Sequence, residues 1–104
     1  MKILKRMILN KEHIKRTIET FFSQKPVKKV WLFGSYARGD ADENSDVDVL
    51  IDFEENSKIG IRYLVWHEEM EQLLNKKVQI VSNASLSKFI RPFVEEDKVL
   101  IYEK

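Results

Sequence analysis

The sequence predicts an α/β fold in which helices flank a small mixed β-sheet. Segments with the apolar spacing of helices alternate along the chain with short, continuous apolar runs that are typical of buried strands. Glycine, proline and asparagine stand between these segments, where turns are expected. The 104 residues have the length of one domain, spanning residues 1–104 with a core expected from about residue 10 to residue 102.

The first long helix is predicted to follow Asn10, whose side chain is suited to cap a helix N-terminus. Pro26 closes this unit. Between Asn10 and Pro26, apolar residues recur at helical spacing and predict a buried face made of Ile14, Ile18, Phe21 and Phe22. The preceding residues 1–9 also show helical spacing, which indicates a docked terminal turn or, alternatively, a contact with a second subunit in a homo-oligomer.

Two strands with a turn between them follow. Residues 30–33 are too apolar for a half-exposed strand, and Gly34 breaks this run. A short helix is expected to begin at Ser35, and the polar residues 39–45 are expected to form a loop. Residues 46–53 predict the second strand, because acidic and apolar side chains alternate at its start.

The second half of the chain predicts a helix over residues 60–75 and a strand over residues 78–81. A short helix over residues 92–97, with a proline in its first turn, and a last strand over residues 99–102 complete the chain. The buried stripe of the long helix is expected to comprise Tyr63, Trp66, Met70, Leu73 and Leu74.

Composition excludes several classes of protein. The net charge of +1, from 18 basic and 17 acidic residues, predicts neither nucleic-acid binding nor adhesion to a membrane surface. Cysteine is absent, which excludes disulfides and thiolate metal sites. Lys5 and Arg6 interrupt the N-terminal apolar residues, so a signal peptide is not expected, and no apolar run reaches the roughly 20 residues of a membrane span. A cytoplasmic location is therefore expected.

One stretch carries the chemistry. Gly34 and Ser35 follow an apolar strand, and after ten further residues Asp46 and Asp48 begin the next one. Residues i and i+2 of a strand share a face, so both carboxylates are expected to project the same way, with Cα atoms about 6.5–7 Å apart. Carboxylate oxygens are hard ligands for Mg²⁺, and a bound cation would compensate two acids on an apolar strand.

The glycine–serine turn is expected to hold an anion. Gly34 lacks a Cβ atom, so a ligand can come close to the backbone there. The free N–H groups at the start of the short helix favour a phosphate.

Together these motifs resemble the minimal, antitoxin-type nucleotidyltransferases of the polymerase-β-like superfamily. Their pattern, G-S-x₁₀-D-x-D after a hydrophobic strand, matches here, as do the flanking residues 37–39 and 45–48. The resemblance implies the polymerase-β-like core, one or two Mg²⁺ ions, and ATP or another nucleoside triphosphate as substrate. It implies that Asp46 and Asp48 are catalytic metal ligands, that Gly34 and Ser35 hold the terminal phosphates, and that Arg38 balances phosphate charge or is a simple surface residue.

The family carries a third carboxylate on the following strand, and here Gln79 stands at that position. A glutamine carries no charge and cannot act as a base at neutral pH. Two functions therefore stay open. The first is transfer of a nucleoside monophosphate, AMP by expectation, to a hydroxyl of a HEPN-type partner, as the antitoxin of a toxin–antitoxin pair. The second is a degenerate fold that acts as a partner-binding module.

Overall fold

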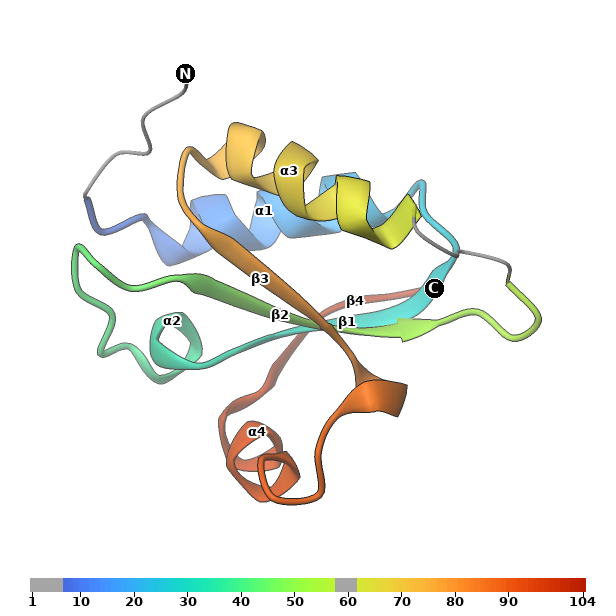
Figure 1. Cartoon of the computed structure of the whole chain (residues 1–104). Coiled ribbons are helices and arrows are strands. Elements are labelled where there is room, and N and C mark those ends of the chain that lie inside the picture. The colour runs from blue at the N-terminus through green and yellow to red at the C-terminus, as the bar shows by residue number, and fades with distance from the viewer. Residues whose placement is uncertain (1–6, 58–61) are drawn as a thin grey trace.

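The computed structural model describes residues 7–57 and 62–104. Within these ranges no helix has both the length and the apolar character needed to cross a membrane. The elements follow one another as α1 (Lys11–Phe22), β1 (Val27–Phe33), α2 (Ser35–Arg38), β2 (Val47–Phe53), α3 (Arg62–Leu74), β3 (Val78–Ser82), a 3-10 turn η1 (Asn83–Ser85), α4 (Arg91–Asp97) and β4 (Val99–Glu103) (Figure 1).

The four strands form one mixed sheet in the order β3-β2-β1-β4. β1 lies between β2 and β4 and pairs with both in the antiparallel sense, whereas β2 and β3 are parallel. α3 connects the two parallel strands, as a parallel pair requires a crossover. The predicted small mixed sheet flanked by helices is confirmed.

The two faces of the sheet differ in what covers them. α1 and α3 lie side by side over one face, and α4 lies on the other (Figure 1). Alternate residues of β2, Val47, Val49 and Ile51, belong to the core beneath α1 and α3. Asp48 and Leu50 therefore face the side of α4. The residues that the sequence singled out thus lie on the face without the long helices.

The start of α1 agrees with the sequence. The Asn10 side-chain oxygen accepts hydrogen bonds from the backbone N–H of Glu12 at 2.8 Å and of His13 at 3.2 Å. The four predicted core residues of this helix are all buried. The terminal turn expected over residues 1–9 lies largely outside the described residues.

Several predicted boundaries and one predicted burial differ from the structure. β1 begins at Val27, three residues before its predicted start at residue 30, because Val27 is buried and pairs with Phe53 of β2. β2 begins at Val47, so Asp46 precedes the strand. Leu73 is 55% exposed, because α3 buries a straight stripe of every fourth residue, Trp66, Met70 and Leu74. The predicted start of that helix at residue 60 lies outside the described residues.

The outer edge of β3 is closed by side chains of α3. Val78 and Ile80 donate their backbone N–H groups to Glu71 Oε2 at 3.0 Å and to His67 Nε2 at 3.1 Å. Tyr63 donates its hydroxyl to the carbonyl of Ile80 at 2.7 Å. This row satisfies an edge strand that would otherwise expose unpaired backbone groups, and it fixes β3 beside β2.

Candidate functional site

The turn after β1 places a backbone N–H pair beside the acidic strand. Gly34 adopts φ +76°, a conformation that glycine tolerates without strain. Its carbonyl accepts hydrogen bonds from the N–H groups of Ala37 and Arg38, both at 3.0 Å, which closes the single turn of α2. The N–H groups of Ser35 and Tyr36 precede any intrahelical acceptor, so they are available to an anion.

Gly34 and Asp48 are in direct contact. Phe33, the last residue of β1, pairs with Asp48 of β2. A Cβ atom built on Gly34 would lie 2.2 Å from Asp48 Oδ2, well inside van der Waals contact. The missing side chain of the glycine therefore makes the space that the carboxylate occupies. The two halves of the motif, separated by ten residues in the sequence, meet at this point.

The Asp48 carboxyl has an unusual proton affinity. Burial is the largest cause and the negative charge of Asp46 adds to it, while the positive charge of Arg38 opposes them, and together they raise the pKa of Asp48 to about 6. Two carboxylates that repel each other in a partly buried site favour a bound proton or a cation. This donor set fits a divalent ion that prefers oxygen ligands.

This pKa predicts how the stability of the metal-free protein depends on pH. Between about pH 4 and pH 6 the folded protein holds a proton on Asp48 that the unfolded chain has lost, so stability decreases as the pH rises through that window. In EDTA, Asp48→Asn is expected to be more stable than wild type above pH 6, and the advantage is expected to shrink toward pH 4. Urea midpoints measured from pH 4 to pH 8 test this, and a difference that does not change with pH would contradict it.

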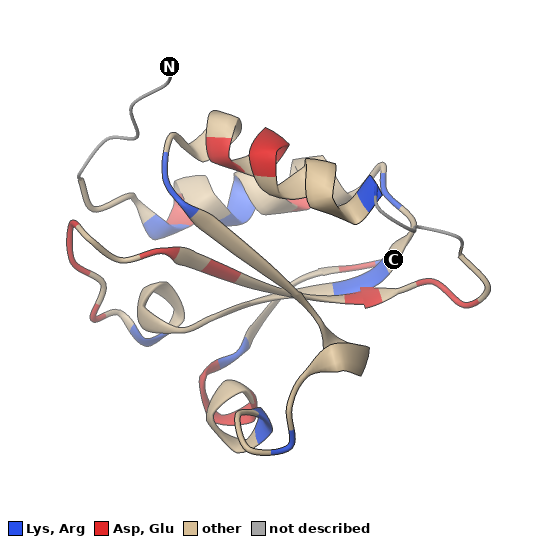
Figure 2. Cartoon of the chain, viewed as in Figure 1, with Lys and Arg blue, Asp and Glu red and all other residues tan. Residues whose placement is uncertain are grey.

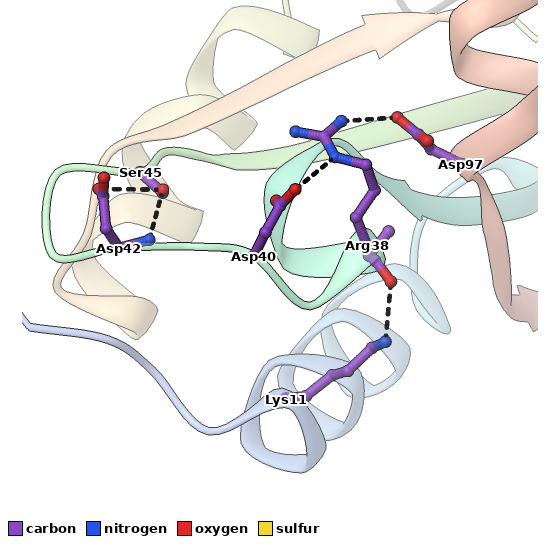
Figure 3. Close-up of polar contacts among 7 residues, drawn as sticks. Lys11, Arg38, Asp40, Asp42, Ser45 and Asp97 are labelled. Atoms are coloured by element: carbon purple, nitrogen blue, oxygen red, sulfur yellow. Dashed lines mark hydrogen bonds and ion pairs between the residues drawn. The ribbon is translucent and has the colours of Figure 1, made fainter.

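Arg38 lies at this site but is already bound by carboxylates. Its Nε donates to Asp40 Oδ2 at 3.1 Å and its Nη1 to Asp97 Oδ2 at 2.7 Å, so it joins α2 to the end of α4 (Figure 3). These partners raise its pKa. A guanidinium has five N–H donors, and three remain for another acceptor. Arg38 is thus held in orientation near Asp48 and keeps donors for a phosphate.

The loop before β2 is built around Asp42. Its side-chain oxygen accepts from the Asn44 N–H at 2.8 Å and from the Ser45 hydroxyl at 3.2 Å, and that hydroxyl accepts the Asp42 N–H at 2.8 Å (Figure 3). The Ser45 hydroxyl thus bonds within its own loop. Asp42 is exposed and organises the turn that leads into Asp46.

Gln79 stands beside Asp48. The two are Cα partners on the parallel strands β2 and β3, so their side chains share a face of the sheet. Figure 2 shows acidic positions along the first part of β2, next to α2. In residues 7–57 and 62–104 no group of three acidic, histidine or cysteine side chains is placed to hold a metal. The chain therefore offers a pair of carboxylates with an amide where a third acid would complete the set.

The match to a known family decides the identity of this fold. The nucleotidyltransferase domain family matches residues 14–101. The chain belongs to this family. Residues 14–101 include the turn, both aspartates and Gln79, so every residue proposed from the sequence lies within the nucleotidyltransferase domain.

Known proteins agree with this assignment. The chain is 39% identical over 75 residues to the protein adenylyltransferase MntA of Thermococcus cleftensis, covering 72% of this chain and 75% of that protein. It is similar to a solved structure described as a candidate minimal nucleotidyltransferase, with a TM-score of 0.70, 28% identity, and coverage of 88% of this chain and 95% of that one. The expected relation to minimal nucleotidyltransferases with the polymerase-β-like fold is confirmed.

A further solved structure shares the fold. It contains a tri-AMPylated HEPN toxin of Shewanella oneidensis in complex with an MNT antitoxin, and the likeness has a TM-score of 0.71 at 15% identity. It covers 91% of this chain and 74% of that one. At this identity the likeness shows the architecture of the nucleotidyltransferase domain alone.

Proposed function

We propose that this nucleotidyltransferase transfers AMP from ATP, with Mg²⁺, to a hydroxyl of a HEPN-type protein, and so acts as the antitoxin of a toxin–antitoxin pair. The single observation that carries the proposal is the contact of Asp48 with Gly34, which joins a pair of acids to an anion-binding turn. Magnesium is bound in many nucleotide sites by one or two carboxylates together with phosphate oxygens, and this site offers such a pair.

The residues would divide the work as follows. Asp46 and Asp48 would hold the cation. The turn at Gly34 and Ser35 would bind the terminal phosphates through the N–H groups of Ser35 and Tyr36 and the Ser35 hydroxyl. Arg38, fixed by its two carboxylates, would face the triphosphate with its remaining donors. The bound Mg²⁺ supplies positive charge that neutralises the triphosphate.

The reaction would then depend mostly on positioning. The acceptor oxygen forms a bond to the α-phosphorus, the bond from that phosphorus to the β-phosphate oxygen breaks, and pyrophosphate leaves while the hydroxyl proton passes to solvent water. The fixed turn and the acids hold the donor so that the acceptor can approach in line. Gln79 cannot take the proton, because an amide is not a base at neutral pH.

The partner is proposed from the relatives. The protein of Thermococcus cleftensis to which the chain is 39% identical is named a protein adenylyltransferase, which supports AMP as the group transferred and protein as the acceptor. The structure with a tri-AMPylated HEPN toxin supports a toxin of that class as the acceptor. A second chain is therefore expected to present the hydroxyl.

The proposal is tested with α-³²P-labelled ATP and a HEPN-type protein encoded with the chain. We expect label to appear on the HEPN-type protein with Mg²⁺ and to be absent with EDTA. γ-³²P-labelled ATP serves as the control, because AMP transfer leaves the γ-phosphate in pyrophosphate. Label from the γ position, or none from the α position with any divalent metal, would contradict AMP transfer.

Gln79 favours the second candidate function, a partner-binding module without chemistry. Restoring an acid with Gln79→Asp is expected to raise the rate of AMP transfer, by up to about 10²–10⁴-fold if a missing general base limits it. Gln79→Ala is the matched control and is expected to leave the rate near that of wild type. If the wild type transfers no AMP, and the Asp46→Asn, Asp48→Asn double variant still neutralises the HEPN-type protein, the binding module is the better description.

A further inference from the structure

Asp46 needs an anchor that the sheet does not supply. β2 begins at Val47, so Asp46 is the last residue of the loop and has no place in the strand ladder. A metal ligand in a loop is less precisely held than one in a strand, unless neighbouring contacts fix it. The structure contains such contacts on both sides of Asp46, and both come from the connection between α3 and β3.

On the N-terminal side of Asp46, the side chain of Lys76 holds the loop at Glu43. This side chain is only 4% exposed, and among the described residues it is the one charged group in the buried set. Its Nζ donates to the carbonyl of Glu43 at 2.6 Å and to the carbonyl of Met7 at 2.7 Å. A buried ammonium is costly, so these bonds to backbone oxygens hold it and the loop together.

On the C-terminal side of Asp46, Lys77 holds the chain at Val47. The Val47 N–H donates to the carbonyl of Lys77 at 3.0 Å. Between the two anchors, the Ser45 N–H donates to the carbonyl of Asp42 at 3.1 Å, and this bond closes the turn that Asp42 organises. Lys76 therefore binds the backbone of a hydrogen-bonded turn, and Asp46 lies between that turn and Val47.

Lys76 also links this loop to α2 through residues 7–11, which lead into the start of α1. Lys76 binds the carbonyl of Met7. Two residues on, the Leu9 N–H donates to the hydroxyl of Tyr36 in α2 at 3.2 Å. The Lys11 Nζ donates to the carbonyl of Ala37 at 3.0 Å (Figure 3). Residues 7–11 thus connect the acidic loop to α2, the two halves of the site.

We propose that Lys76 is a positioning residue, which fixes Asp46 relative to Asp48 and the phosphate turn so that the two carboxylates can share one divalent ion. The inference rests on the proposed function, because it assigns a role in holding the metal–nucleotide complex. Lys76 itself touches neither nucleotide nor metal. Its effect passes through the backbone of the loop at Glu43.

The test compares Lys76→Met, which keeps the alkyl chain and removes the donors, with wild type. Lys28→Met, at an exposed lysine of β1, is the control. Two quantities are measured in the full chain: ¹⁵N order parameters of residues 43–46, and the affinity for Mn²⁺ with AMP-PNP by calorimetry. In Lys76→Met we expect the order parameters to fall from about 0.85 to below about 0.6 in the loop and to stay high in β1.

The affinity for Mn²⁺ with AMP-PNP is expected to fall about 10–100-fold in Lys76→Met and to stay at the wild-type value in Lys28→Met, since groups that orient metal ligands have effects of this size. A rigid loop or an unchanged affinity in folded Lys76→Met would overturn the proposal. If that variant does not fold, Lys76→Arg, which keeps donors, carries the test, and it must then retain the ordered loop and most of the affinity. A wild type that binds no Mn²⁺ with AMP-PNP would instead contradict the proposed function.

Discussion

Asp48→Asn is expected to lower AMP transfer to the partner protein by about 10²-fold or more, which is the scale seen when a preorganised electrostatic group is removed. Asparagine has nearly the same size, so the contact with Gly34 and the strand can be kept, but the ligand loses its negative charge. The partly buried position of Asp48, with its pKa raised to about 6, makes it the acid most in need of a cation. Label incorporated from α-³²P-labelled ATP measures the effect.

Asp52→Asn is the matched control. Asp52 lies on the same strand and the same face as Asp48, but two pleats further along, about 13 Å away at Cα. It is therefore too far away to share an ion with bonds of about 2 Å. We expect Asp52→Asn to transfer AMP at the wild-type rate. Equal losses in the two variants would show that charge on this face, and not metal ligation at Asp48, supports the reaction.

Gly34→Ala is expected to remove both nucleotide binding and transfer. Its Cβ would meet Asp48 Oδ2 at 2.2 Å, so the carboxylate must move away from the turn. The backbone at φ +76° and ψ −156° lies in a region that essentially only glycine adopts, which adds strain of about 1–3 kcal/mol for an alanine. Calorimetry with ATP and Mg²⁺ is expected to show the loss of binding, and a urea midpoint gives the loss of stability.

The chain holds a control that separates these two effects. Gly39 also has a positive φ, +88°, but a Cβ built there meets nothing within 4 Å. Gly39→Ala is therefore expected to lose stability through backbone strain alone and to keep its affinity for ATP with Mg²⁺. If Gly34→Ala and Gly39→Ala lose the same affinity, backbone strain explains the result and the contact with Asp48 does not matter for binding.

The sequence predicted the parts of this molecule that depend on near neighbours. Asn10 caps α1 through N–H groups two and three residues away, and the buried face of that helix follows from its period. The alternation of helices and strands predicted the mixed sheet. The G-S-x₁₀-D-x-D spacing predicted that the turn and the acids belong together, although only the structure places Gly34 against the Asp48 oxygen.

The contacts between distant residues could not be predicted from one sequence. Arg38 binds Asp97, 59 residues away, and nothing in either segment indicates that α4 ends beside α2. Nothing in the sequence distinguishes Lys76 from Lys77, yet Lys76 is buried against carbonyls 33 and 69 residues away. The exposure of Leu73 also depends on how α3 is rotated on the sheet, because Leu73 and Leu74 both suit a broad apolar face.

Calorimetric titration of ATP into the full chain, with Mg²⁺ and then with EDTA, tests the central claim most directly. The account predicts saturable binding of one ATP per chain with Mg²⁺, loss of that binding with EDTA, and loss of it in Asp48→Asn with Mg²⁺ present. Binding of equal strength with EDTA, or the same Mg²⁺-dependent binding in Asp48→Asn, would contradict a site in which the acids and the glycine turn hold the metal-loaded triphosphate together.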